Sequence, residues 1–218
     1  MTAEEKYAFI AEILPRYIAH RHGLYKAHGY NANALQVRCD SVAHKRSGQL
    51  GSRKVESVLQ ANGLTKLAAG STVGDFLNGD GIYILTDSDG KKLFVELLRS
   101  LGLWFRWSSG HQNKFPDFAV RIGGRISIIE HKHMKEGGGG QDKQIAELIE
   151  FIKQNDPVSY VSFLDGVFFN QLTSSGTRGK NAEQLTQIEQ ALRANPYNYF
   201  LNTAGFERRL DLARSPRS

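Results

Sequence analysis

Apolar residues recur at intervals of three and four positions along several stretches of the chain, which is the pattern of helices with one apolar face. The first stretch covers residues 3–22 and includes Pro15, where we expect a kink. Its apolar positions are Phe9, Ile10, Ile13, Leu14, Tyr17 and Ile18. A second helix is predicted over 53–62, with Ser52 as its N-cap and Gly63 after its end. The remaining helices are predicted over 91–101, 141–154, 180–195 and 199–213.

Shorter apolar runs bounded by glycine, proline or aspartate predict strands. Three of them lie at 81–85, 103–108 and 157–170. Between 115 and 133, apolar residues alternate with others on both sides of Gly123-Gly124, which is the pattern of a β-hairpin. The succession of helices and strands predicts an α/β fold with a mixed central β-sheet flanked by helices. Neither repeats nor linkers interrupt it, so we expect a single domain over residues 1–218.

The predicted hairpin brings two acidic residues together. If Gly123 and Gly124 are the central residues of the turn, Asp117 and Glu130 are equally far from it and lie opposite each other. Because side chains alternate between the faces of a strand, Lys132 shares the face of Glu130. His131 and His133 then point to the other face, where we expect them to be packed or exposed rather than to bind a metal through their rings.

Two carboxylates in this position repel each other. Their Cβ atoms are about 5 Å apart in opposite strand positions, and the repulsion is about 3 kcal/mol at an effective dielectric constant of about 20. A divalent cation between Asp117 and Glu130 would offset it, and Mg²⁺ suits a site of one or two carboxylates. Lys132 would lie beside the metal and orient or deprotonate a water. The alternative is a solvated hairpin in which Glu130 pairs with Lys132 or Arg121, but the many branched apolar neighbours argue against solvation.

Pro116-Asp117, followed after twelve residues by Glu130-His131-Lys132, resembles the signature of PD-(D/E)XK nucleases. The glycine run over 137–140 and the "QDKQ" that follows are similar to what many type II restriction endonucleases contain. The resemblance covers residues 115–153. It implies a restriction-endonuclease-like core, catalysis by Asp117, Glu130 and Lys132, and the backbone carbonyl of His131 as a further metal ligand.

The same resemblance implies an activity and an organisation. The expected enzyme is a Mg²⁺-dependent, sequence-specific endonuclease of double-stranded DNA, with Mn²⁺ as a substitute metal, that leaves 5′-phosphate and 3′-hydroxyl ends. It is expected to act as a homodimer, in the cytoplasm of a prokaryote, with a DNA methyltransferase as its genetic partner. Residues 1–80 would then form a helical part, about 81–170 the catalytic core and about 180–214 the C-terminal helices. The alternatives are a repair or recombination nuclease that recognises DNA structure, and a DNA-binding module without activity.

Nucleases of this kind often use a further acid from an upstream helix. Glu56 borders the apolar positions of the helix predicted over 53–62, so we expect it near the core. Glu96 shares a helix face with basic residues, which is typical of a solvated surface. We therefore predict that Glu56 completes the site, and the alternative is a boundary glutamate paired with Arg53 or Gln60.

Charge and composition agree with a nucleic-acid partner without demanding one. The net charge is +6 and the sequence pI is about 9.4. Basic and amide side chains in the loop over 41–55, after the glycine run and in the segment over 170–181 are candidates to contact DNA, although solvated loops are the alternative. They are Lys45, Arg46, Arg53, Lys54, Gln141, Gln144, Arg178 and Lys180.

The composition also excludes some classes of protein. Cys39 is the only cysteine, which excludes an internal disulfide and a cysteine-based metal cluster. No run of 18 apolar residues predicts a membrane span, and the acidic, amphipathic N-terminal segment is unlike a secretory signal. We expect a cytosolic protein.

Overall fold

A computed structural model describes residues 2–28, 51–86, 90–103, 115–134, 139–174 and 176–214. The chain divides into two compact units, Met1–Leu50 and Gly51–Ser218. In the first unit, α1 (Ala3–His28) contains Pro15 and extends six residues beyond the predicted end. None of the helices within the described ranges is long and apolar enough to cross a membrane.

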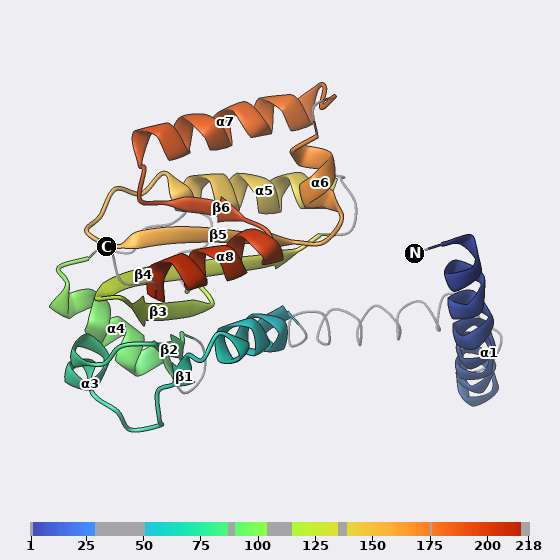
Figure 1. Ribbon diagram of the computed structural model, residues 1–218, viewed down its shortest axis with the longest axis horizontal. Coiled ribbons are helices and arrows are strands. Elements are labelled where there is room, and N and C mark those ends of the chain that lie inside the picture. The colour runs from blue at the N-terminus through green and yellow to red at the C-terminus, as the bar shows by residue number, and fades with distance from the viewer. Residues whose placement is uncertain are drawn as a thin grey trace. The chain divides into compact units, whose positions relative to one another are not determined.

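The second unit is built on one mixed sheet of six strands in the order β1-β2-β3-β4-β5-β6 (Figure 1). The strand β3 is antiparallel to both of its neighbours, β2 and β4. The other neighbouring pairs, β1 with β2, β4 with β5 and β5 with β6, are parallel. Their bounds are β1 Thr65–Lys66, β2 Ile82–Leu85, β3 Phe118–Ile122, β4 Arg125–His133, β5 Ser159–Asp165 and β6 Tyr199–Leu201. The predicted α/β class and mixed central sheet are confirmed.

The β3–β4 hairpin has the predicted turn. Gly123 and Gly124 have φ angles of 57° and 72°, which is the conformation that a two-residue turn of this type requires. The pairing runs from Ile122 with Arg125 at the turn to Phe118 with Ile129 at the other end. The strand register expected from the sequence is therefore correct for every pair of this ladder.

Helices cover both faces of the sheet. A helix occupies 51–61, and the others are α3 Val73–Asn78, α4 Lys91–Ser100, α5 Gly139–Ile152, α6 Phe168–Leu172, α7 Lys180–Ala194 and α8 Thr203–Arg214. We call the two sides of the sheet the α8 face and the α5 face. The α8 face packs against α8 and the helix over 51–61, through Phe118, Val120, Ile129, Val161 and Phe163. The α5 face packs against α3, α4 and α5, through Ile84, Ala119, Ile128 and Tyr160.

Several predicted elements differ in detail. Ser52 lies inside its helix, so it is not the N-cap, whereas Gly63 adopts φ 67° after the end and Leu64 N donates to Leu59 O there. Part of 157–170 is the helix α6, because the strand ends at Asp165. The predicted helix over 199–213 begins with the strand β6. The elements β1 and α3 were not predicted, and most of the strand expected at 103–108 lies outside the described residues.

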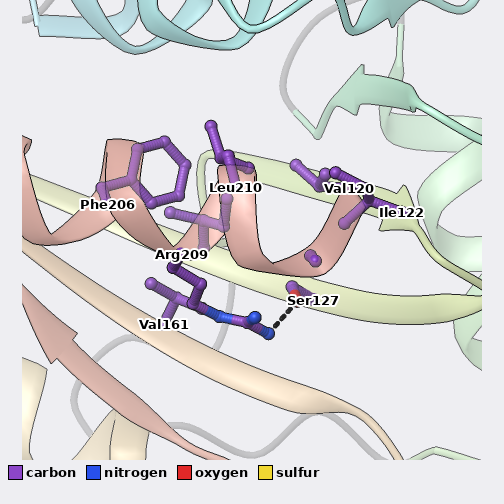
Figure 2. A pocket seen from close by; sticks show the side chains of 9 residues that line it. Val120, Ile122, Ser127, Val161, Phe206, Arg209 and Leu210 are labelled. Atoms are coloured by element: carbon purple, nitrogen blue, oxygen red, sulfur yellow. Dashed lines mark hydrogen bonds between the residues drawn. The ribbon is translucent and has the colours of Figure 1, made fainter. Parts of the chain in front are cut away.

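A small pocket lies between α8 and the α8 face of the sheet (Figure 2). Arg209 of α8 reaches across it and donates to Ser127 Oγ at 3.2 Å. Its guanidinium also lies over the ring of Tyr199, 4.0 Å from the centroid. Burial lowers the pKa of Arg209, and Arg125 lowers it further. Because its other lining residues are mostly apolar, we interpret this pocket as part of the core rather than as a site of chemistry.

Asp165 connects four elements at the carboxyl end of β5. Its carboxylate accepts hydrogen bonds from Lys54 Nζ at 2.6 Å, from His133 Nδ1 at 3.1 Å and from Thr203 Oγ1 at 3.0 Å. These donors lie in the helix over 51–61, in β4 and in α8. Burial by itself raises the pKa of Asp165, but the three hydrogen bonds outweigh it and hold the pKa at about 2.

The substitution Asp165→Asn should therefore destabilise the fold and remove part of its acid sensitivity. The depressed pKa contributes about 2 kcal/mol of stability, which is fully present above the ordinary aspartate pKa near 4 and is lost as the pH falls toward 2. Urea unfolding at a series of pH values measures the slope of the free energy of unfolding against pH. The exposed Glu96 provides a control, since Glu96→Gln should leave the slope unchanged. An unchanged slope in Asp165→Asn would show that the network does not hold the charge.

Candidate active site

Asp117 lies at the entrance of β3, beside β4. Its amide donates to Ile129 O at 2.9 Å, and its Oδ2 accepts a hydrogen bond from His131 N at 2.8 Å. The regular pairing predicted for Asp117 with Glu130 does not form, because the ladder ends at Phe118 and Ile129. The carboxylate nevertheless lies against the backbone of the residue that directly follows Glu130. The hairpin thus brings both acids to the same end of the sheet.

Glu130 is fully buried on the α5 face of β4, two residues beyond Ile128. Its Oε1 accepts a hydrogen bond from Lys132 Nζ. Lys132 Nζ also lies 3.9 Å from Oε2 of Glu147, a residue of α5. The side chains of Lys132 and Glu147 are only 14% and 12% exposed, so this cluster is largely withdrawn from water.

Acidic side chains and one lysine meet around Glu130. Among the residues that the structure describes here, Asp117, Glu130 and Glu147 are acidic and Lys132 is basic. The ammonium of Lys132 and the amide of His131 offset part of the repulsion that the sequence predicted between the two acids. The pairing of Glu130 with Lys132 was the alternative expected for a solvated hairpin, but here the pair is buried.

The imidazoles lie on the α8 face, as the alternation of the strand predicted. The ring of His131 packs against Phe163, with centroids 4.9 Å apart, and His133 binds Asp165. Burial lowers the pKa of His131 to about 4, so its ring is neutral at neutral pH. The ring of His131 therefore does not belong to the acidic cluster, and its carbonyl as a metal ligand stays a prediction.

Glu56 is not brought together with the two acids. Its Oε1 lies 3.4 Å from Lys66 Nζ and accepts a hydrogen bond from the hydroxyl of Tyr83 at 3.4 Å. Tyr83 packs in the α8-face core, whereas Glu130 lies on the α5 face. The expectation that Glu56 lies near the core is correct, but the partner is Lys66 rather than Arg53 or Gln60. Glu96 is exposed on α4.

The predicted DNA contacts have different surroundings. Lys45 and Arg46 lie outside the described residues, as does the side chain of Gln141. Lys54 is paired with Asp165, and Lys180 is paired with Asp142 at 2.7 Å. Arg53 and Arg178 are exposed, and Gln144 is partly buried on α5. Exposed Arg53 and Arg178 thus stay the simplest candidates among the described basic residues.

Two residues of this region were missed in the sequence. Glu147 lies three residues after Gln144 and therefore on the same side of α5. This spacing could have predicted that Glu147 lies near the apolar side of the helix. Asp165 is the last residue of β5, and a carboxylate at the end of a mostly apolar strand was a signal for a residue held at the sheet end. Its partners come from distant segments, and no local pattern indicates them.

The comparisons with family models, with curated proteins and with solved structures found no match. A functional proposal therefore depends on the fold and on the residues around Glu130.

The kinds of metal site that these residues could form differ in the number of ligands that they need. Within the described ranges, no three His, Cys, Asp or Glu side chains form a group that could hold a metal ion. A zinc site needs three or four such ligands. Mg²⁺ usually takes only one or two carboxylates, and its remaining ligands are waters and substrate phosphate oxygens. Asp117 and Glu130 could supply that number of carboxylates, so a Mg²⁺ site stays a prediction.

Proposed function

We propose that the chain is a Mg²⁺-dependent endonuclease that cleaves double-stranded DNA at a specific sequence, like type II restriction enzymes. The observation that carries this proposal is the grouping of Asp117, buried Glu130 and Lys132 at one end of the β3–β4 hairpin. The net charge of +6 favours a polyanionic substrate. The mixed sheet with helices on both faces is compatible with a restriction-endonuclease-like core, which we include in the proposal.

Asp117 and Glu130 would hold the cation, and the carbonyl of His131 would be a third oxygen ligand, as in the nuclease signature that the sequence resembles. When bound, Mg²⁺ would stabilise the negative charge that develops on the phosphate and lower the pKa of a water. Lys132 is held beside Glu130 by its hydrogen bond and has one carboxylate on each side. From this position its ammonium can orient a water or neutralise charge on a phosphate oxygen.

The proposal also includes a homodimer. A protein that cuts both strands of a palindromic site matches the two-fold symmetry of that site most simply with two identical subunits. Equilibrium sedimentation of the full chain with and without DNA measures the number of subunits.

The first test is digestion of plasmid and phage DNA by the full chain, with Mg²⁺ or with EDTA. Discrete fragments that require Mg²⁺ and end in 5′-phosphates are the expected result, and sequencing of the ends then gives the recognition site. We expect Asp117→Asn to lose this cleavage, because it removes a negative ligand while it keeps the size of the side chain. If Asp117→Asn cuts as well as the parent protein, the site assignment is wrong. Smeared or junction-dependent products would indicate a nuclease that recognises DNA structure.

A further inference from the structure

Thr86 is a fully buried residue directly after β2, and its hydroxyl makes no hydrogen bond with the part of the chain that the structure describes. A buried hydroxyl without a partner is destabilising relative to an apolar group of the same shape. Valine has that shape and is at least as favourable in a strand. The fold alone therefore gives no reason for a hydroxyl at this position.

The position of Thr86 is next to the acidic cluster. Its amide donates to Asp117 O at 3.2 Å, so the two residues are neighbours across adjacent strand ends. Ile84, two residues earlier, packs on the α5 face of the sheet. Because strand side chains alternate, the side chain of Thr86 is expected on that face as well, which is the face of Glu130.

Ser162 provides a comparison within the same face. It pairs with Glu130 in the β4–β5 ladder and is also fully buried. Its hydroxyl, however, donates to Leu148 O of α5 at 2.8 Å, so it has a structural role in joining the sheet to that helix. The hydroxyl of Ser162 therefore stabilises the fold through a hydrogen bond, whereas the hydroxyl of Thr86 does not.

We propose that Thr86 is a positioning residue of the cation site, whose hydroxyl accepts a hydrogen bond from a water bound to the Mg²⁺ that Asp117 and Glu130 hold. This inference rests on the proposed function. Mg²⁺ keeps several of its waters when it binds to proteins, and these waters need acceptors. Partners in the outer shell of a metal site tune its affinity by about 10-fold or more.

The test compares Thr86→Val, Thr86→Ser and Ser162→Ala in the full chain. Titration calorimetry gives the Mg²⁺ affinity, and thermal unfolding in EDTA gives the stability of the metal-free fold. Thr86→Val should weaken Mg²⁺ binding about 10-fold while its unfolding temperature in EDTA stays equal or rises. Thr86→Ser should restore the affinity, because it keeps the hydroxyl. Ser162→Ala should do the opposite of Thr86→Val, with lower stability and unchanged affinity.

Three results would overturn the inference in distinguishable ways. If Thr86→Val binds Mg²⁺ like the parent protein while Asp117→Asn does not bind, the role of Thr86 is wrong and the proposed site stands. If the parent protein binds no Mg²⁺, the proposed function fails and the inference fails with it. A loss of stability in Thr86→Val without a change in affinity also overturns it, since that is the result of a purely structural role.

Discussion

The substitution Lys132→Met should abolish DNA cleavage and also destabilise the fold by about 3 to 5 kcal/mol. Glu130 is fully buried and accepts a hydrogen bond from Lys132, so the substitution leaves a carboxylate in the core without its ammonium. The carboxylate of Glu147, 3.9 Å from the same ammonium, loses this neighbour as well. Cleavage should fall by at least about 100-fold, the usual contribution of a positioned acid or base. Urea unfolding and plasmid digestion measure the two effects separately.

The double substitution Glu130→Gln with Lys132→Met provides the control for this prediction. It removes the charge from both members of the pair, so most of the stability should return while cleavage stays absent. Lys132→Arg keeps the positive charge but changes its geometry, and it should recover stability more fully than activity. A Lys132→Met protein that is as stable as its parent would contradict the buried ion pair as a determinant of stability.

The second large effect is expected from Gly166→Ala, which should cost about 3 kcal/mol or more. Gly166 has a φ angle of 105°, a conformation that residues with a Cβ atom rarely adopt. An added Cβ would lie 2.1 Å from Met134 O, and that oxygen accepts a hydrogen bond from Phe168 N at the start of α6. The ends of β4 and β5 and the first turn of α6 would all have to shift. Thermal unfolding followed by circular dichroism measures the loss.

Gly102→Ala is the matched control for this second prediction. Gly102 also has a positive φ angle, 67°, but an added Cβ there meets no atom within 4 Å. The control should therefore cost only the backbone strain, about 1 to 2 kcal/mol. Equal losses in the two variants would show that the close approach to Met134 has no effect of its own.

The parts of the fold that the sequence predicted well are those with a strong local signal. Alternation around Gly123-Gly124 was sufficient for the register of the hairpin from Ile122 to Phe118, but the predicted pair of Asp117 with Glu130 lies just beyond the end of this ladder. The helices α4, α5 and α7 were predicted to within two residues of their bounds, because periodicity over several turns is unambiguous, whereas α1 extends six residues beyond its predicted end. The strand β6 was predicted as the start of a helix, since three residues are too few to show a period of their own.

The parts that could not be predicted depend on contacts between distant segments. The sequence indicated that Lys54 belongs to a basic loop, but its amino group is held by Asp165, which lies 111 positions later. Similarly, the apolar positions around Glu56 correctly placed it near the core but did not reveal on which side of the sheet its helix packs. Packing decides this, and it separates Glu56 from Glu130.

The alternation of Glu130 and His131 along β4 has a consequence for folding. A slip of the strand by a single residue would drive the carboxylate into the apolar layer beneath α8 and would turn the neutral imidazole toward the acids. Chains with such a shifted register would be strongly disfavoured. The two-residue turn at Gly123-Gly124 also makes them difficult to form, because it fixes which residues of β3 and β4 pair. A turn that is one residue longer would specify the register less strictly. We therefore expect slower folding and off-pathway species in such a variant.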